Sequence, residues 1–359
     1  MADVDATPAG NVVEVIFIGC GRPNFSMGWT HLEQMLREPL ASLAAVVGVV
    51  EPYYLSEACV PGEDAELFRE YVAAHKDLRF VPSCTALAKE LPAVAPGRVR
   101  AAIISTRTPD VLPAFQGAVL ELGCRAVYLE KPGAATVAHL DDIAQLAEKH
   151  QVDVVVGYNR NVSLHVRRAL AFAKEREADM GTPPSVTLLH GNPFCDKEMN
   201  EVFRRCRPGL FYDMACHELA IAVGFFGLTA AGYSELRVDK ASSLQAVHGG
   251  ITDFVRAAFS LRPAPGAEPI GFQIDRQAGS FNGIDVDGRR FLSGEPPLLY
   301  TNPLQSLSSH IALNYDQYVE AKRIFLSALA PVNARAAMPA AAPAAAPRVA
   351  PTAPAPSIS

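Results

Sequence analysis

Residues 12–21 read VVEVIFIGCG, a β-branched apolar run that stops at two glycines separated by one residue. A short run of this kind, bounded by glycine, predicts a buried strand. Apolar residues then follow at helical spacing, at Trp29, Leu32, Met35 and Leu36. Strand, glycine turn and helix in this order predict the first unit of a fold in which strands and helices alternate.

Four further apolar runs continue this alternation through the first half of the chain. They lie at 43–50, 100–104, 125–129 and 152–156, and helical stretches such as TVAHLDDIAQLAEKH separate them. Strands without polar alternation are buried on both faces, as in parallel sheets covered by helices on both sides. We therefore predict an α/β protein whose first domain, residues 10–157, is a Rossmann doubly wound parallel sheet.

The pattern changes after Gly157. A helix is predicted at 161–178, longer strands at 251–261 and 270–281, and a closing amphipathic helix at 307–329. Asp287-Gly288 between two strand-like runs predicts a hairpin turn. We expect a second α+β domain at 158–330 with an open mixed or antiparallel sheet. The Ala/Pro-rich residues 331–359 predict a disordered tail.

Composition excludes several classes of function. The chain has 359 residues, 49% of them hydrophobic, and a formal net charge of -6 without a block of Lys or Arg, which argues against nucleic acid or anionic membrane as a partner. No apolar run reaches the roughly 20 residues that span a bilayer, and the N-terminus lacks the pattern of a signal peptide. We expect a soluble cytoplasmic protein that acts on a small molecule.

The seven cysteines are widely spread and never form C-x-x-C. This spacing argues against a disulfide framework and against a zinc site. Asp213, His217 and His190 do not have the spacing of a dedicated metal site either. We predict reduced thiols and no metal.

The turn after the first strand predicts dinucleotide binding. Gly19 and Gly21 stand where a pyrophosphate needs close backbone approach and N–H donors at a helix N-terminus. The third glycine of G-x-G-x-x-G is absent at strict spacing, because Asn24 stands there and Gly28 comes four residues later. A tight turn that binds no ligand is the alternative.

Glu51 ends the second predicted strand, where a carboxylate can accept hydrogen bonds from ribose hydroxyls and repel a 2′-phosphate. This favours NAD as the cofactor. Arg22 leaves NADP possible, and an isolated strand-end acid in solvent is the alternative for Glu51.

Glu130-Lys131-Pro132 directly follows the predicted strand at 125–129, and at this motif the sequence resembles the family of glucose-fructose oxidoreductase, inositol dehydrogenase and MocA. The other pieces of the resemblance occur in family order over residues 12–330: the glycine turn, Ser105-Thr106, Gly157-Tyr158-Asn159-Arg160, and Asp213 with His217.

The resemblance implies a catalytic trio of Lys131, Asp213 and His217, with Ser105, Thr106 and Glu130 added to the cofactor site. Oxidation of an alcohol needs a base for the hydroxyl proton while hydride leaves for nicotinamide. We expect burial or a nearby cation to lower the pKa of Lys131 toward neutrality. Asp213 and His217 are four apart in a predicted helix, so both side chains can share one face.

Asn159 and Arg160 leave the last strand of the first domain toward the same cleft, where they are candidates for binding substrate. Two departures from the family pattern, Ala220 and Arg107-Thr108-Pro109, leave the substrate open. The predicted function is an NAD(P)-dependent oxidoreductase acting on CH–OH groups of a cyclic polyol or sugar derivative. A redox-neutral NAD-dependent lyase or glycosidase and a noncatalytic dinucleotide-sensing protein are the alternatives. The resemblance also implies a homodimer or homotetramer.

Overall fold

The protein is described from a computed structural model that covers residues 13–205, 209–293 and 303–329. The first half of the chain builds a six-stranded sheet in the order β3-β2-β1-β4-β5-β6, in which all neighbouring strands are parallel. This order and direction confirm the predicted Rossmann sheet. Its strands are β1 (Val13–Ile18), β2 (Ala44–Val50), β3 (Phe80–Val81), β4 (Val99–Ile104), β5 (Ala126–Leu129) and β6 (Asp153–Val156).

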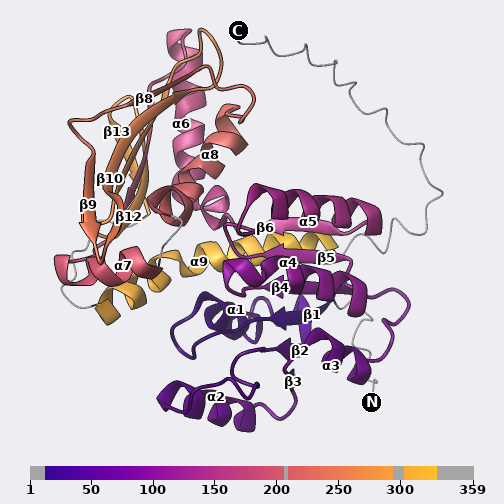
Figure 1. Ribbon diagram of the computed structural model, residues 1–359. Coiled ribbons are helices and arrows are strands. Elements are labelled where there is room, and N and C mark those ends of the chain that lie inside the picture. The colour runs from indigo at the N-terminus through magenta and orange to yellow at the C-terminus, as the bar shows by residue number, and fades with distance from the viewer. Residues whose placement is uncertain (1–12, 206–208, 294–302, 330–359) are drawn as a thin grey trace, which may run out of the picture.

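Helices cover both faces of this sheet. Alternate strand residues point to opposite sides, and the residues on both sides are apolar, so each face is buried under helices. Ile16, Ile18 and Ile104 enter one core, whereas Phe17 and Ile103 enter the other. The α-helices along this part of the chain are α1 (Met27–Met35), α2 (Glu63–Ala74), α3 (Cys84–Glu90), α4 (Val111–Gln116) and α5 (Val137–His150), as Figure 1 shows.

The second half of the chain builds a seven-stranded mixed sheet, which confirms the predicted sheet type. The order is β13-β12-β7-β11-β10-β8, and β9 pairs with β10; only β7 and β11 run parallel. The helices α6 (Leu164–Met180) and α8 (Cys216–Phe226) pack on it, and η4 (Asp196–Glu198) and α7 (Met199–Arg205) lie at one end. Its strands are β7 (Val186–Gly191), β8 (Glu235–Val238), β9 (Leu244–His248), β10 (Ile251–Arg262), β11 (Ile270–Asp275), β12 (Phe281–Val286) and β13 (Arg289–Leu292).

Two turns in this sheet show how local sequence sets strand ends. The single strand predicted at 270–281 is divided, because the Asp275 carboxylate accepts from the Gln277 N–H at 2.8 Å and Gly279 has a φ of +97°. The hairpin predicted at Asp287-Gly288 joins β12 and β13, and both residues have positive φ, 49° and 82°. Positive φ at both central positions is the requirement of a type I′ turn.

The last described helix, α9 (Pro303–Leu329), returns to the first domain. Phe325, Leu326 and Leu329 lie in the core that covers one face of the parallel sheet. Figure 1 shows the helix running beside β5 and β6. The predicted domain limits at 157 and 330 stay predictions, and the tail predicted at 331–359 lies outside the described residues.

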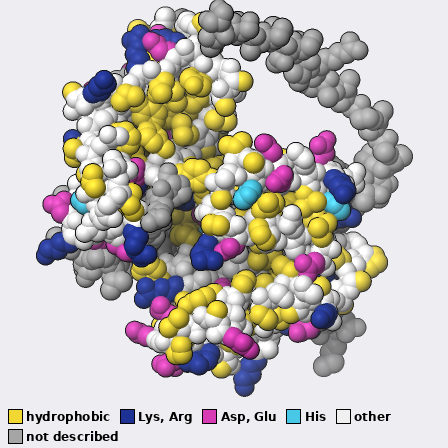
Figure 2. Space-filling view, viewed as in Figure 1, with side chains coloured by type: hydrophobic (Ala, Val, Ile, Leu, Met, Phe, Trp, Pro, Cys, Tyr) yellow, Lys and Arg dark blue, Asp and Glu magenta, His cyan; other side chains and the backbone are white. Residues whose placement is uncertain are grey.

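Hydrophobic side chains gather on the face of the second domain that Figure 2 presents. Among the residues that the structure describes, no helix is long and apolar enough to cross a membrane. The described cysteines are free thiols.

Candidate active site

The carboxyl edge of the parallel sheet holds the candidate residues in place. Each first residue after a strand extends the sheet's hydrogen bonding: the N–H of Glu51 donates to Val81 at 2.9 Å, and the N–H of Glu130 donates to Ile104 at 2.9 Å. Gly19 is held in the same way, with its N–H 2.8 Å from the carbonyl of Val50. Side chains far apart in sequence therefore share one edge, where open α/β sheets bind ligands.

The glycine turn has the backbone that its sequence predicts. Gly19 and Gly21 have φ of +81° and +68°, a region that side chains rarely adopt. A Cβ on Gly28 would stand 2.5 Å from the carbonyl oxygen of Gly19. Gly28 therefore takes the place of the third glycine, letting α1 pack closely on the turn, and residues 22–26 lengthen the turn before the helix begins.

Glu51 closes this turn with its carboxylate. One oxygen accepts from the N–H groups of Cys20 and Gly21, both at 2.9 Å, and the other accepts from the N–H of Tyr53 at 3.0 Å. The side chain is buried, and burial together with Glu51 raises the pKa of the Cys20 thiol well above its usual value. The Cys20 thiol is thus neutral, and Glu51 fixes the turn as well as facing the cleft.

All the residues predicted to bind the cofactor line one cleft of about 1010 Å³. That volume is at the upper end of the roughly 300–1,000 Å³ typical of ligand pockets. The Arg22 guanidinium at its rim is paired with Asp64 at 2.8 Å and lies over the ring of Phe25. The predicted cofactor residues in the lining are Gly19, Gly21, Arg22, Glu51, Ser105, Thr106 and Glu130.

These features suit a dinucleotide. A Cβ on Gly19 would meet the Thr106 side chain at 2.7 Å, so only glycine lets the two walls approach here. The first turn of α1, from Met27, presents N–H groups that the helix itself does not use, and these favour an anion. Gly19, Gly21 and the start of α1 would hold a pyrophosphate, and Glu51 would face the ribose.

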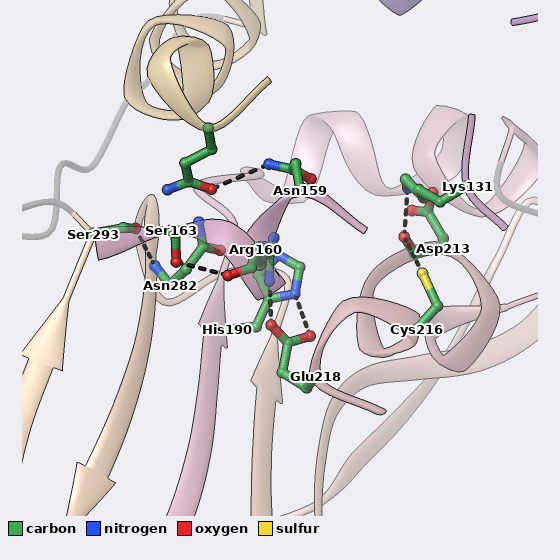
Figure 3. Close-up of polar contacts among 11 residues, drawn as sticks. Lys131, Asn159, Arg160, Ser163, His190, Asp213, Cys216, Glu218, Asn282 and Ser293 are labelled. Carbon is green, nitrogen blue, oxygen red and sulfur yellow. Dashed lines mark hydrogen bonds and ion pairs between the residues drawn. The ribbon is translucent and has the colours of Figure 1, made fainter. Parts of the chain in front are cut away.

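The Glu-Lys-Pro loop is joined to the second domain by two hydrogen bonds. Lys131 Nζ donates to the main-chain carbonyl of Asp213 at 2.9 Å, and the Tyr212 hydroxyl donates to the carbonyl of Ala134 at 2.5 Å. Figure 3 shows Lys131, Asp213 and Cys216 side by side. The structure thus brings together two of the three residues implied as catalytic.

The pKa of Lys131 moves opposite to the expectation. Burial opposes its charge, but the acidic groups of Cys216, Asp213 and Glu130 raise its pKa above the ordinary lysine value. The expectation of a lowered pKa was wrong because Asp213 and Cys216, from η5 (Phe211–Ala215) and α8, add their effect to that of the neighbouring Glu130. Burial raises the pKa of the Cys216 thiol to about 11, which disfavours a reactive thiolate.

His217 lies on α8 just after a π-helical turn, η5 (Phe211–Ala215), that contains Asp213. The predicted helix is present, but its first turn is wider than an α-helix, a feature frequent at functional sites. The His217 ring is buried and lies edge-on to Tyr158, with ring centroids 6.1 Å apart. Tyr158 follows β6, so His217 also borders the carboxyl edge of the parallel sheet.

Asn159 and Arg160 are both buried, and each donates hydrogen bonds to other protein groups. Asn159 Nδ2 donates to Gln317 of α9 at 3.1 Å. Arg160 forms an ion pair with Glu218 and donates to His190 Nε2 at 2.9 Å, while His190 Nδ1 lies 3.1 Å from Glu218 (Figure 3). Their proposed contact with substrate stays a prediction.

Sequence reasoning missed Glu218 and His190. Burial opposes the charge of Glu218, but Arg160 and His190 lower its pKa, so it is a carboxylate. Burial and Arg160 lower the pKa of His190, which is therefore neutral and donates through Nδ1. Within the described ranges, no cluster of three or more His, Cys, Asp or Glu side chains could hold a metal ion.

Comparison with known proteins identifies the dinucleotide-binding half. Residues 13–158 match the GFO_IDH_MocA family model, described as "Oxidoreductase family, NAD-binding Rossmann fold". No curated protein matches the chain.

Solved structures resemble the chain over most of its length. One is apo scyllo-inositol dehydrogenase from Lactobacillus casei, with a TM-score of 0.65 and 14% identity over 90% of this chain and 89% of that one. A myo-inositol dehydrogenase from Corynebacterium glutamicum has a TM-score of 0.56 and 15% identity over 91% and 96%. The WlbA (WbpB) dehydrogenase from Thermus thermophilus, in complex with NAD and alpha-ketoglutarate, has a TM-score of 0.55 and 14% identity over 93% and 97%.

At these identities the solved structures show a shared fold. The family description names NAD, in agreement with the cofactor predicted from Gly19, Gly21 and Glu51. Residues 13–158 are thus similar to an oxidoreductase family with an NAD-binding Rossmann fold, the family that the sequence resembles at Glu130-Lys131-Pro132.

Proposed function

We propose that this protein is an NAD-dependent dehydrogenase or reductase of a hydroxylated small molecule, a cyclic polyol or sugar derivative. The observation that carries the proposal is Lys131, held by the Asp213 carbonyl directly after Glu130, which lines the dinucleotide cleft. Two of the similar structures are inositol dehydrogenases, which supports a cyclic polyol as the substrate class.

The chain's own residues divide the proton chemistry between them. A bound dinucleotide would supply the hydride acceptor or donor. Lys131, charged at neutral pH because its pKa is raised, donates hydrogen bonds and stabilises negative charge that develops on a substrate oxygen. His217 accepts the hydroxyl proton in oxidation and returns it in reduction. Asp213 orients the substrate hydroxyls or the imidazole.

NAD is the proposed dinucleotide, with NADP the weaker ligand. Glu51 places a buried carboxylate at the end of β2, where a 2′-phosphate would be repelled. Arg22 is the cation that favours a phosphate, but it is already paired with Asp64. NADH is therefore expected to bind more tightly than NADPH.

The first experiment is a fluorescence titration of the purified protein with NADH and NADPH, with Glu51→Ala as the variant. We expect tighter NADH binding that Glu51→Ala weakens, because the variant removes both the ribose partner and the acceptor of the Cys20 and Gly21 N–H groups. Absence of binding by either dinucleotide would overturn the proposed function and favour a noncatalytic role.

A screen of cyclic polyols and sugars then tests the reaction, with absorbance at the nicotinamide band as the readout. Lys131→Met and His217→Ala are expected to lower kcat by about 100-fold or more, the usual contribution of a positioned acid or base. Lys149→Met, at the exposed end of α5, is the matched control and should keep the wild-type rate. Turnover without a net absorbance change would identify a redox-neutral lyase or glycosidase instead.

We also propose a homodimer or homotetramer, supported by large apolar side chains of the second domain that are exposed in the single chain. Patches of this kind often mark interfaces. Sedimentation of the purified protein as a monomer would contradict this proposal. The exposed side chains are Leu236, Val238, Leu244 and Val247.

A further inference from the structure

Three side chains, two of them buried, form a hydrogen-bonded chain that leads away from the cleft. The Glu130 carboxylate lies 2.9 Å from Nε2 of His31, and Nδ1 of His31 lies 2.8 Å from Nζ of Lys322. Glu130 lines the cleft, whereas His31 and Lys322 have no solvent exposure. They come from the loop after β5, from α1 and from α9, which passes beside β5 in Figure 1.

The geometry permits two proton arrangements with the same total charge. In one, Lys322 is an ammonium that donates to Nδ1 of His31, and Nε2–H donates to the Glu130 carboxylate. In the other, a protonated Glu130 donates to Nε2, and Nδ1–H donates to neutral Lys322. Moving from the second to the first breaks the O–H bond of Glu130 and the Nδ1–H bond of His31. It forms the Nε2–H bond and a third N–H bond on Lys322, so the proton count is unchanged.

The surroundings let Lys322 exchange a proton near neutral pH. Burial lowers the pKa of Lys322 to about 7, although Glu130 opposes this shift. Burial and Lys322 lower the pKa of His31, so the imidazole is a neutral link. Besides Glu130 and His31, the titratable groups that face the chain are Tyr128 of β5 and Tyr318 of α9, both with raised pKa, and Lys131 lies beside Glu130.

We propose that Glu130, His31 and Lys322 form a proton relay, in which Lys322 stores one proton exchanged with the cleft through Glu130. The relay rests on the proposed function of that cleft. Oxidation of an alcohol to a carbonyl breaks one C–H bond as hydride and one O–H bond as a proton, so each turnover releases one proton to be carried away. His31 and Lys322 act on the site through Glu130 and are positioning residues.

The first test needs no cofactor and follows the thermal unfolding temperature from pH 6 to 8.5. Above pH 7 the folded chain releases the Lys322 proton, whereas the unfolded chain keeps it up to about pH 10.5. The unfolded state then binds more protons, so stability rises with pH. We expect this rise in the wild type and in Arg323→Met, an exposed neighbour on α9, and its loss in Lys322→Met. Parallel profiles for all three proteins would overturn the proposal.

The second test measures the rate of proton release by stopped flow in weakly buffered solution when NAD⁺ binds near pH 7. The cationic nicotinamide ring, bound beside Glu130, would favour a neutral Lys322, so the wild type is expected to release a proton. His31→Gln should bind NAD⁺ and keep the stability rise, but release the proton at least threefold more slowly, because it interrupts the chain at its middle. If Lys322→Met does not fold, His31→Gln alone still tests the relay.

Equal rates of proton release by the wild type and His31→Gln would overturn the relay while leaving the cofactor site intact. Failure of the wild type to bind either dinucleotide would instead overturn the proposed function and, with it, the relay. The stability profiles distinguish the two failures, because they report on Lys322 in the chain alone.

Discussion

Charged side chains around the cleft differ in what they are free to contact. The carboxylate of Glu51 is buried and accepts three main-chain N–H groups, so it is fixed before any ligand arrives. Arg22 is half-exposed and paired with Asp64. An exposed pair of this kind is worth about 0–1 kcal/mol. The preference for NADH over NADPH therefore depends on two groups. Glu51 is rigidly held and repels a 2′-phosphate, whereas Arg22 is weakly held and attracts one.

Replacing Asp64 by Asn frees Arg22 and is expected to improve NADPH binding by about two- to fivefold, the range that a surface ion pair of this strength allows. NADH binding should change less, because it carries no 2′-phosphate. Titration of both dinucleotides measures the ratio, with Glu63→Gln, an exposed acid on the same helix turn, as the control. An unchanged ratio in Asp64→Asn would show that Arg22 does not reach the ligand.

The residues predicted to bind the cofactor line one cleft, because each lies at or shortly after the end of a predicted strand; their contact with a cofactor stays a prediction. The sequence did not predict how Lys131 is charged, since Asp213 and Cys216 approach from the second domain. Nor could it pair Arg160 with Glu218, 58 positions further along the chain, or with His190, on β7. Such contacts depend on packing between elements and leave no local pattern.

Helix α1 rests on the glycine turn through a close backbone contact at Gly28. Alanine is a better helix former than glycine, yet its Cβ would stand 2.5 Å from the Gly19 carbonyl oxygen and 2.9 Å from that of Cys20. Gly28→Ala is therefore expected to destabilise the fold by about 1–3 kcal/mol, as overpacking does, and to weaken NADH binding.

Urea unfolding and NADH titration check this prediction. Gly62→Ala is the control, because a Cβ there would meet nothing within 4 Å. Stabilisation by Gly28→Ala would mean that the helix moves away from the turn without cost.

Helix α8, which carries His217, is anchored by the next residue, Glu218. Glu218→Gln leaves the Arg160 charge buried without its carboxylate and is expected to cost about 3 kcal/mol, near the lower limit for breaking a buried pair. Chemical denaturation measures the loss. Glu201→Gln breaks an exposed pair with Arg204 and should cost less than about 0.5 kcal/mol. Equal losses in the two variants would contradict the anchoring role.

At the level of elements, long buried strands were predicted to within a residue or two, as β1 and β4 show. Two features of the sheets were not predicted from the sequence. The first is the strand β3 (Phe80–Val81), which has only two residues and is too short to show a periodicity. The second is the parallel pairing of β7 with β11, because β11 begins at Ile270, far along the chain from the start of β7 at Val186. Edge strands and long-range pairings depend on the completed sheet.

Over the whole molecule, buried histidines make stability depend on pH. Burial and Arg160 lower the pKa of His165 to about 4, and the pKa values of His31 and His190 are also lowered. Below pH 6.5 the unfolded chain takes up protons that the folded chain excludes, so the free energy of unfolding falls as pH falls toward 4. One such group contributes on the order of 3 kcal/mol over this range.

Denaturation at pH 7, 6, 5 and 4.5 is expected to show this loss in the wild type and a shallower one in His165→Leu. Leu164→Ala, at an exposed position on the same helix whose side chain does not titrate, should keep the wild-type slope. An identical slope in His165→Leu would mean that His165 is protonated in the folded protein.

The return of α9 to the first domain also bears on how the protein is made. A ribosome adds about 5–20 residues per second and domains tend to fold as they emerge, but Phe325, Leu326 and Leu329 complete a core whose strands begin at Val13. The nascent dinucleotide-binding domain therefore has one apolar face only partly covered, by α1 and α2, until the second domain has been synthesised. A fragment ending near residue 158 would keep the rest of that face exposed.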